Sequence, residues 1–262
     1  MRLVALFGLL VAWPAAGEYA EVHGLKMYYE VHGEGRSVVL LHGGMSTIQF
    51  SFAAQIPALA HNHRVIALEQ MGHGHTADIA GRELSYAGMA EDTFAFLVQR
   101  GIRNADLLGF SDGGQIALRL AFTHPEMVRR VVVSGVGLGA LSPERQTAMR
   151  NLSPNLLPKA FREEYDRVSP DGPAHWPAIF EKVRAMWSTP GWGVSGPELA
   201  TIKARVLLVF GDRDFTGVEE AASIFHGIPG AQLCILPGTG HGTFRDRPEW
   251  LNPVVLDFLD RN

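Results

Sequence analysis

Three things are scarce in this sequence: cysteine, clustered positive charge and long hydrophobic runs. Cys234 is the only cysteine among 262 residues, so no disulfide can form within the chain. The chain has 23 Lys and Arg against 27 Asp and Glu, a formal net charge of −4, and no basic run. This composition argues against binding to nucleic acid or to anionic membrane surfaces. The apolar run Leu3 to Ala12 is too short to span a bilayer, so we expect no stable membrane anchor.

The start of the chain has the pattern of a secretory signal. Arg2 precedes the apolar run, and the small residues at 15–17 offer a cleavage site before Glu18. We therefore predict that residues 1–17 are a signal peptide and that the mature protein is secreted or periplasmic. A lone cysteine is compatible with that location. We expect Cys234 to be a small buried hydrophobe within a strand.

The strongest motif is G-F-S-D-G at residues 109–113, centred on Ser111. A short apolar run at 105–108 predicts a strand before it, and residues 112–124 have the apolar spacing of a helix that Pro125 ends. A serine on such a sharp strand-to-helix turn points outward, and the flanking glycines allow close packing. Because a strand and a helix flank the motif, we interpret Ser111 as a nucleophile rather than an incidental turn residue.

A nucleophilic serine needs a base, and 11 histidines compete for that role. We select His241, because it lies in a glycine-flanked loop directly after the predicted strand 231–236. His73 and His75 would suggest a metal, but they complete no compact zinc spacing, so we expect ordinary loop histidines there.

The base in turn needs an orienting carboxylate, which should follow another strand. The apolar run 205–210 leads into G-D-R-D, which offers Asp212 and Asp214. No carboxylate follows the preceding predicted strand, residues 131–136. Both aspartates stay open at this point.

An oxyanion hole can be predicted from backbone groups. The strand predicted at 38–41 runs into His42-Gly43-Gly44, where the chain can turn inward. We assign the N–H groups of Gly44 and Asp112 as the two donors. His42 is expected to be structural and buried beside this turn.

These motifs together resemble the α/β-hydrolase fold superfamily. The HGG loop, the GFSDGG elbow, the GDRD turn and the GTGH loop occur in family order, and the resemblance extends from about Val22 to Leu259. The S-D-G-G form of the elbow is similar to that of valacyclovir hydrolases and several small carboxylesterases. The resemblance implies that Asp214 is the triad acid. Many relatives carry a proline shortly after this acid, whereas residues 215–219 here contain none.

The resemblance and the alternating βα pattern predict one α/β domain at residues 18–262, with a mainly parallel sheet and helices on both faces. An antiparallel hairpin at 19–31 should lead in. Residues 139–200, rich in proline and tryptophan, break the rhythm and should form a small helical cap inserted before the acid-bearing strand. Met45, Phe110 and Phe215 lie nearest the predicted catalytic loops, so we expect them to contact substrate.

The predicted function is hydrolysis of a small-molecule carboxylic ester by a serine hydrolase that needs no metal or organic cofactor. Ser111 argues against the dehalogenases and epoxide hydrolases of this fold, which use a carboxylate nucleophile. Lactonase, amidase, C–C hydrolase and perhydrolase activities stay open, as does a ligand-binding receptor. Two roles for Asp112 also stay open: a stabilising charge in the first turn of its helix, or a partner for a cationic group such as the ammonium of an amino-acid ester.

Overall fold

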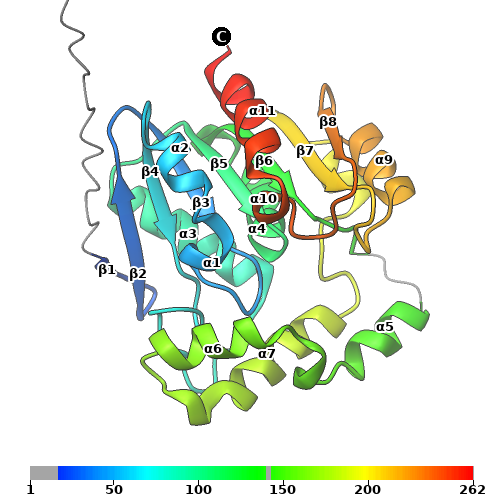
Figure 1. Cartoon of the computed structure of the whole chain (residues 1–262). Coiled ribbons are helices and arrows are strands. Elements are labelled where there is room, and N and C mark those ends of the chain that lie inside the picture. Colours follow the sequence, from blue (N-terminus) through cyan, green and yellow to red (C-terminus); the bar gives the residue numbers. More distant parts are fainter. Residues whose placement is uncertain (1–16, 140–142, 262) are drawn as a thin grey trace, which may run out of the picture.

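The computed structural model describes residues 17–139 and 143–261. The predicted signal peptide lies outside these residues apart from Gly17, and so do residues 140–142 of the predicted cap. The described chain forms an eight-stranded sheet with helices on both faces and a group of helices at one end (Figure 1). This is the α/β fold class that the sequence predicts.

The sheet has the order β1-β2-β4-β3-β5-β6-β7-β8. Its pairs are parallel from β4 to β8, whereas β1 pairs antiparallel with β2, and β2 with β4. The strands are β1 (Glu18–Val22), β2 (Leu25–His32), β3 (Arg36–Leu41), β4 (His63–Leu68), β5 (Ala105–Phe110), β6 (Val128–Ser134), β7 (Arg205–Gly211) and β8 (Gln232–Leu236). The lead-in hairpin is thus present, with Val22 opposite Leu25 beside its turn.

Two hydrophobic cores cover the two faces of the sheet, because successive side chains of a strand point to opposite sides. On β3, Val39 and Leu41 enter one core, whereas Val38 and Leu40 enter the other. The first core is covered by α3 (Tyr86–Gln99), α4 (Asp112–Thr123) and α9 (Val218–Gly227). The second is covered by α1 (Ile48–Phe52), α2 (Gln55–Leu59), α10 (Thr243–Asp246) and α11 (Pro248–Asp260).

Two local predictions differ from the structure. Strand β6 covers 128–134 rather than 131–136, and it ends where Gly135 turns at a φ of +67°. A Cβ atom at Gly135 would lie 2.6 Å from the His241 ring. Cys234 does lie in a strand, but it is only partly buried, because β8 is the edge strand of the sheet.

The segment between β6 and β7 holds α5 (Pro143–Arg150), α6 (Lys159–Val168), α7 (Trp176–Ser188), α8 (Gly196–Leu199) and the short 3₁₀ turns Pro154–Leu156 and Pro173–His175. A further 3₁₀ turn, Pro125–Met127, follows α4. Helices α5, α6 and α7 lie at the bottom of Figure 1, and buried residues of α7 belong to the first core. Helix α8 falls inside the predicted insertion but packs against α4 and α9 of the body.

Three contacts show where this cap sits. Thr47, after β3, donates to Glu164 of α6 at 3.0 Å. Lys182 of α7 donates to Asp78, after β4, at 2.7 Å. A third contact, from α7 to the residue after Ser111, is described below. The cap therefore lies over the carboxyl ends of β3, β4 and β5, where α/β sheets usually bind ligands.

Candidate active site

Ser111 sits on a strained turn between β5 and α4. Its backbone has φ +52° and ψ −116°, a conformation that non-glycine residues rarely adopt. The flanking glycines are required by close packing: a Cβ at Gly109 would clash with the carbonyl of Gly113, and a Cβ at Gly113 would clash with that of Leu41. Burial of the whole of β5 holds this turn in place.

His241 and Asp214 complete a hydrogen-bonded chain with Ser111. His241 Nε2 lies 2.9 Å from Ser111 Oγ, and Nδ1 lies 3.1 and 3.2 Å from the two carboxylate oxygens of Asp214. A proton on Nδ1 satisfies the carboxylate and leaves the Nε2 lone pair to accept the serine proton. The structure thus brings together three side chains that are far apart in the sequence.

The two candidate acids lie in different surroundings. Asp212 is exposed, whereas Asp214 is buried and also accepts a hydrogen bond from the Thr216 N–H at 3.0 Å. Burial alone would raise the pKa of Asp214, but hydrogen bonds from His241 and Thr216 and the charge of His241 outweigh it. The pKa therefore lies below its usual value, and the carboxylate stays ionised beside the imidazole.

The predicted oxyanion donors lie close to one another. Gly43 directs its N–H to Ser51 Oγ at 3.4 Å, whereas the N–H groups of Gly44 and Asp112 donate to no group among the described residues. A Cβ at Gly44 would clash with the Asp112 carboxylate. Neither N–H group is thus engaged within the described part of the chain, as the predicted role requires.

The Asp112 side chain lies in the first turn of α4 and is buried rather than solvated. It is 7% exposed and accepts hydrogen bonds from the Tyr86 hydroxyl at 2.6 Å and from Trp187 Nε1 at 3.0 Å. Burial raises the pKa of Asp112 to about 6, against the opposing effects of these two donors and of the charge on His241. Because Trp187 belongs to α7, the cap is tied directly to the nucleophile turn.

Sequence reasoning did not find Tyr86 or Trp187. Tyr86 begins α3 just after the helix cap Ser85, and nothing local marks it as a partner of a residue 26 positions away. The tryptophan content of 139–200 did point to the cap, but not to which indole reaches the elbow. Tyr86 also packs against Trp192, with ring centroids 5.5 Å apart.

The three predicted substrate-contact residues have different positions. Met45 is 5% exposed and lines a small pocket beneath the cap. Phe215 is 65% exposed, and its ring centroid lies 4.2 Å from that of His241, at the mouth of the site. Phe110 is 6% exposed and packs in the second core with Phe244, and its ring centroid lies 5.2 Å from that of His241. Substrate contact by Phe110 stays a prediction.

The remaining histidines near the site have structural contacts. His42 is buried, with Nδ1 2.8 Å from the Gly43 carbonyl and Nε2 accepting the Gln70 N–H at 3.0 Å. Burial, with the nearby His73, lowers the pKa of His42 to about 3, so the ring is neutral. His75 Nδ1 lies 2.9 Å from Oε2 of the buried Glu69. Among residues 17–139 and 143–261, no cluster of side chains could hold a metal ion.

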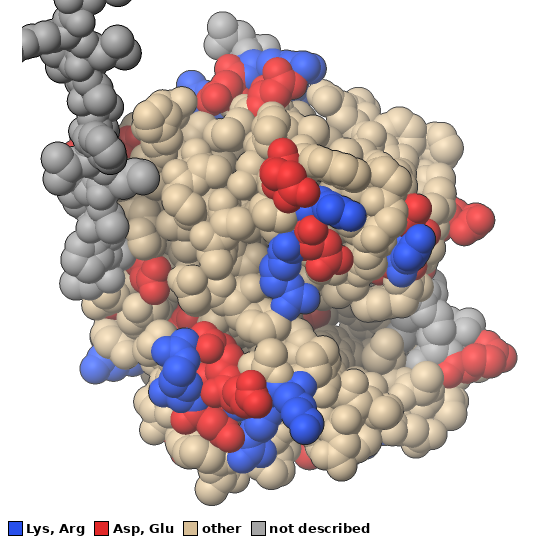
Figure 2. Space-filling model, viewed as in Figure 1, with Lys and Arg blue, Asp and Glu red and all other residues tan. Residues whose placement is uncertain are grey.

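The visible surface carries charges of both signs. Figure 2 shows Lys and Arg side chains interspersed with Asp and Glu, and a hollow between the body above and the cap below. None of the helices within the described residues is long and apolar enough to cross a membrane.

The nucleophile turn, the hydrogen-bonded Ser-His-Asp chain and the sheet order define a hydrolase of the α/β class. The chain belongs to the alpha/beta hydrolase family, whose sequence model matches residues 38–254.

Named relatives lie within the same superfamily. A 2-hydroxymuconate semialdehyde hydrolase from Pseudomonas putida is 27% identical, over 94% of this chain and 95% of its own length. The solved structure of a meta-cleavage product hydrolase from Pseudomonas fluorescens superposes with a TM-score of 0.80 at 22% identity, over 93% of this chain and 97% of that one. Est816, an N-acyl homoserine lactone degrading enzyme, has a TM-score of 0.70 at 26% identity, over 92% and 99% of the two chains.

Proposed function

We propose that this protein is a serine hydrolase of carboxylic esters that acts through an acyl-enzyme on Ser111. The observation that carries this proposal is the continuous chain from Ser111 Oγ through His241 to Asp214. His241 Nε2 takes the serine proton as Oγ attacks the carbonyl carbon of the ester. Asp214 keeps the imidazole in the required tautomer and stabilises its charged form.

The rest of the cycle uses the same groups. The N–H groups of Gly44 and Asp112 stabilise the oxyanion, and each such donor is worth roughly 3–4 kcal/mol in a well-studied protease. His241 then returns the proton to the departing alcohol. A water molecule, activated by His241, attacks the acyl-enzyme and releases the acid.

Carbon–carbon bond cleavage is the second candidate, and the similarity to 2-hydroxymuconate semialdehyde hydrolase favours it. The same serine, base and oxyanion donors serve either reaction, so the residues of the triad do not separate the two.

Turnover tests the proposal directly. We expect the protein to hydrolyse short p-nitrophenyl esters and a phosphonate probe to label Ser111. Ser111→Ala should fold normally and lose activity by roughly 10⁴-fold or more. Retained turnover in folded Ser111→Ala would reject the mechanism. Absence of ester turnover together with cleavage of 2-hydroxymuconate semialdehyde would favour the second candidate, and binding without any turnover would favour a receptor.

A further inference from the structure

Trp187 of the cap contacts both residues that carry the proposed oxyanion donors. Its Nε1 lies 3.0 Å from each carboxylate oxygen of Asp112. Its ring also lies against Gly44, where a Cβ atom would come within 2.7 Å of Trp187 Cζ2 and would clash with Asp112 Oδ2. The backbone of Gly44 thus packs against the indole ring and the Asp112 carboxylate, which are joined to each other by hydrogen bonds.

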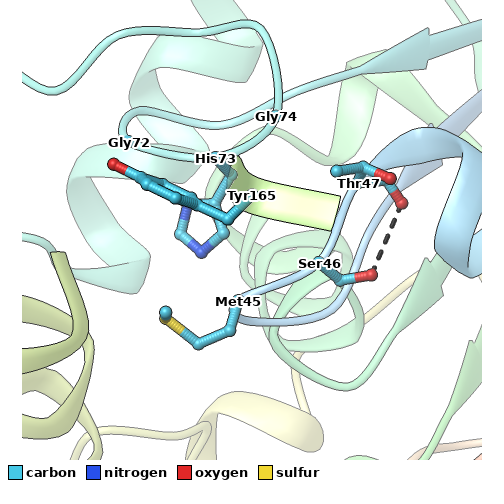
Figure 3. Close-up of a pocket in the computed structure, with 7 residues that line it drawn as sticks. All are labelled: Met45, Ser46, Thr47, Gly72, His73, Gly74 and Tyr165. Atoms are coloured by element: carbon cyan, nitrogen blue, oxygen red, sulfur yellow. Dashed lines mark hydrogen bonds between the residues drawn. The ribbon is translucent and has the colours of Figure 1, made fainter. Parts of the chain in front are cut away.

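The loop that carries the Gly44 donor has a strained backbone. Met45, the next residue, has a φ of +56°, in the left-handed region that non-glycine residues seldom adopt. Such a conformation persists only where the surrounding structure holds it. The Met45 side chain is 5% exposed and lines the small pocket beneath the cap with His73 and Tyr165 (Figure 3). Two cap helices thus adjoin this loop, α7 at Gly44 and α6 beside Met45.

The Asp112 carboxylate is also held from a second direction, by Tyr86. Asp112 is 7% exposed, and the buried Tyr86 at the start of α3 donates its hydroxyl proton to Oδ1 at 2.6 Å. Tyr86 belongs to the body and Trp187 to the cap, so the carboxylate joins the two parts. Two donors from separate elements fix the orientation of this side chain against the Gly44 loop.

We propose that Trp187 of the cap and Tyr86 of the body are positioning residues for the oxyanion hole. Through Asp112 they set the distance between the two N–H donors, Gly44 and Asp112, that stabilise the tetrahedral intermediate. Such donors act when they lie about 2.7–3.1 Å from the oxyanion, and a misplacement of about 1 Å can reduce a rate by about 100-fold. This role rests on the proposed hydrolase function and adds that the cap acts on the chemical step itself.

Trp187→Phe tests the proposal, because it keeps an aromatic ring and removes the indole N–H. We expect kcat for short p-nitrophenyl esters to fall by about 10- to 100-fold, with KM within about threefold of the parent value. An aryl trifluoromethyl ketone gives a second measurement. Ser111 Oγ adds to its carbonyl carbon, the carbonyl oxygen becomes an oxyanion, and the serine proton passes to His241. The inhibition constant of the ketone should rise by about the same factor as kcat falls.

Two further variants separate positioning from a general effect on the cap. Tyr86→Phe removes the other hydrogen bond to Asp112 without altering the cap, and it should also weaken ketone binding. It decides the matter where Trp187→Phe is unfolded by circular dichroism. Trp176→Phe is the matched control, since Trp176 lies in the same helix as Trp187 and packs against Tyr165 with ring centroids 5.3 Å apart. This control should leave kcat and the inhibition constant unchanged.

The outcomes also separate this role from the proposed function. Parent-like values in folded Trp187→Phe and in Tyr86→Phe, an equal loss in Trp176→Phe, or a loss confined to KM would each overturn the positioning role. None of these results affects the hydrolase mechanism, which is tested by ester turnover and ketone inhibition of the parent. A parent protein that shows neither would reject the hydrolase function and the positioning role together.

Discussion

Replacing Asp112 by asparagine should change how stability depends on pH. The Asp112 carboxylate is buried next to the nucleophile, and burial raises its pKa to about 6 from an ordinary value of 3.8. Between these two values the folded state holds a proton that the unfolded state has released. The asparagine variant has no such proton at any pH.

The sign and size of the effect follow from this proton. A carboxyl with a raised pKa stabilises the fold at and below about pH 4, and that contribution is lost as the pH rises to about 6. At about 1.4 kcal/mol per pKa unit, the loss amounts to about 3 kcal/mol. The free energy of unfolding of Asp112→Asn, relative to that of the parent, should therefore increase by about 3 kcal/mol from pH 3 to pH 7.

Urea unfolding followed by tryptophan fluorescence measures this difference at several pH values and constant ionic strength. The asparagine amide forms weaker hydrogen bonds with Tyr86 and Trp187 than the carboxylate does. This cost is the same at every pH, so it does not contribute to the change in stability between two pH values. Asp212→Asn is the control, since Asp212 is exposed. The free energy of unfolding of this variant, relative to that of the parent, should not show the increase with pH expected for Asp112→Asn. A difference between parent and Asp112→Asn that stays constant within about 0.5 kcal/mol would show that burial does not dominate this carboxyl.

Three further predictions concern the site and the start of the chain. Asp214→Asn should reduce ester turnover by roughly 10³–10⁴-fold through a misoriented imidazole, whereas Asp212→Asn should have little effect; the reverse order in steady-state assays would move the acid to Asp212. If Asp112 binds a cationic group, the protein should hydrolyse amino-acid esters faster than matched esters without the ammonium, and Asp112→Asn should abolish that preference. Absence of the preference, or an unchanged preference in Asp112→Asn, would leave Asp112 with only its contacts to Tyr86 and Trp187. Expressed in an export-competent host, the mature protein should begin at or near Glu18; N-terminal sequencing that finds Met1 on the soluble cytoplasmic protein would reject the signal peptide.

Local patterns in the sequence were enough to predict seven of the eight strands, all except β4, and the helix that follows Ser111. The run at 105–108, the glycines around Ser111 and the helical spacing that follows belong to one contiguous stretch, so their geometry depends on near neighbours. The same holds for the strands before Gly44, Asp214 and His241. Parallel strands end at the same edge of the sheet, which is why residues after three different strands could be expected to meet.

The acid of the triad could not be chosen from the local sequence pattern alone. Asp212 and Asp214 both follow β7, and only family resemblance favoured the second. The structure separates them by burial: the turn after β7 directs Asp214 inward against His241 and leaves Asp212 exposed.

The surroundings of the site depended on the tertiary structure alone. Asp112 could be recognised as a charged residue beside the nucleophile, but Tyr86 and Trp187 reach it from 26 and 75 positions away. That His73 and Tyr165 both line one pocket likewise depends on where α6 packs over the sheet. Periodicity and turn chemistry act over a few residues and therefore determine elements and their edges. Which side chains meet across the cap depends on how separate elements pack, and no pattern along the chain records that packing.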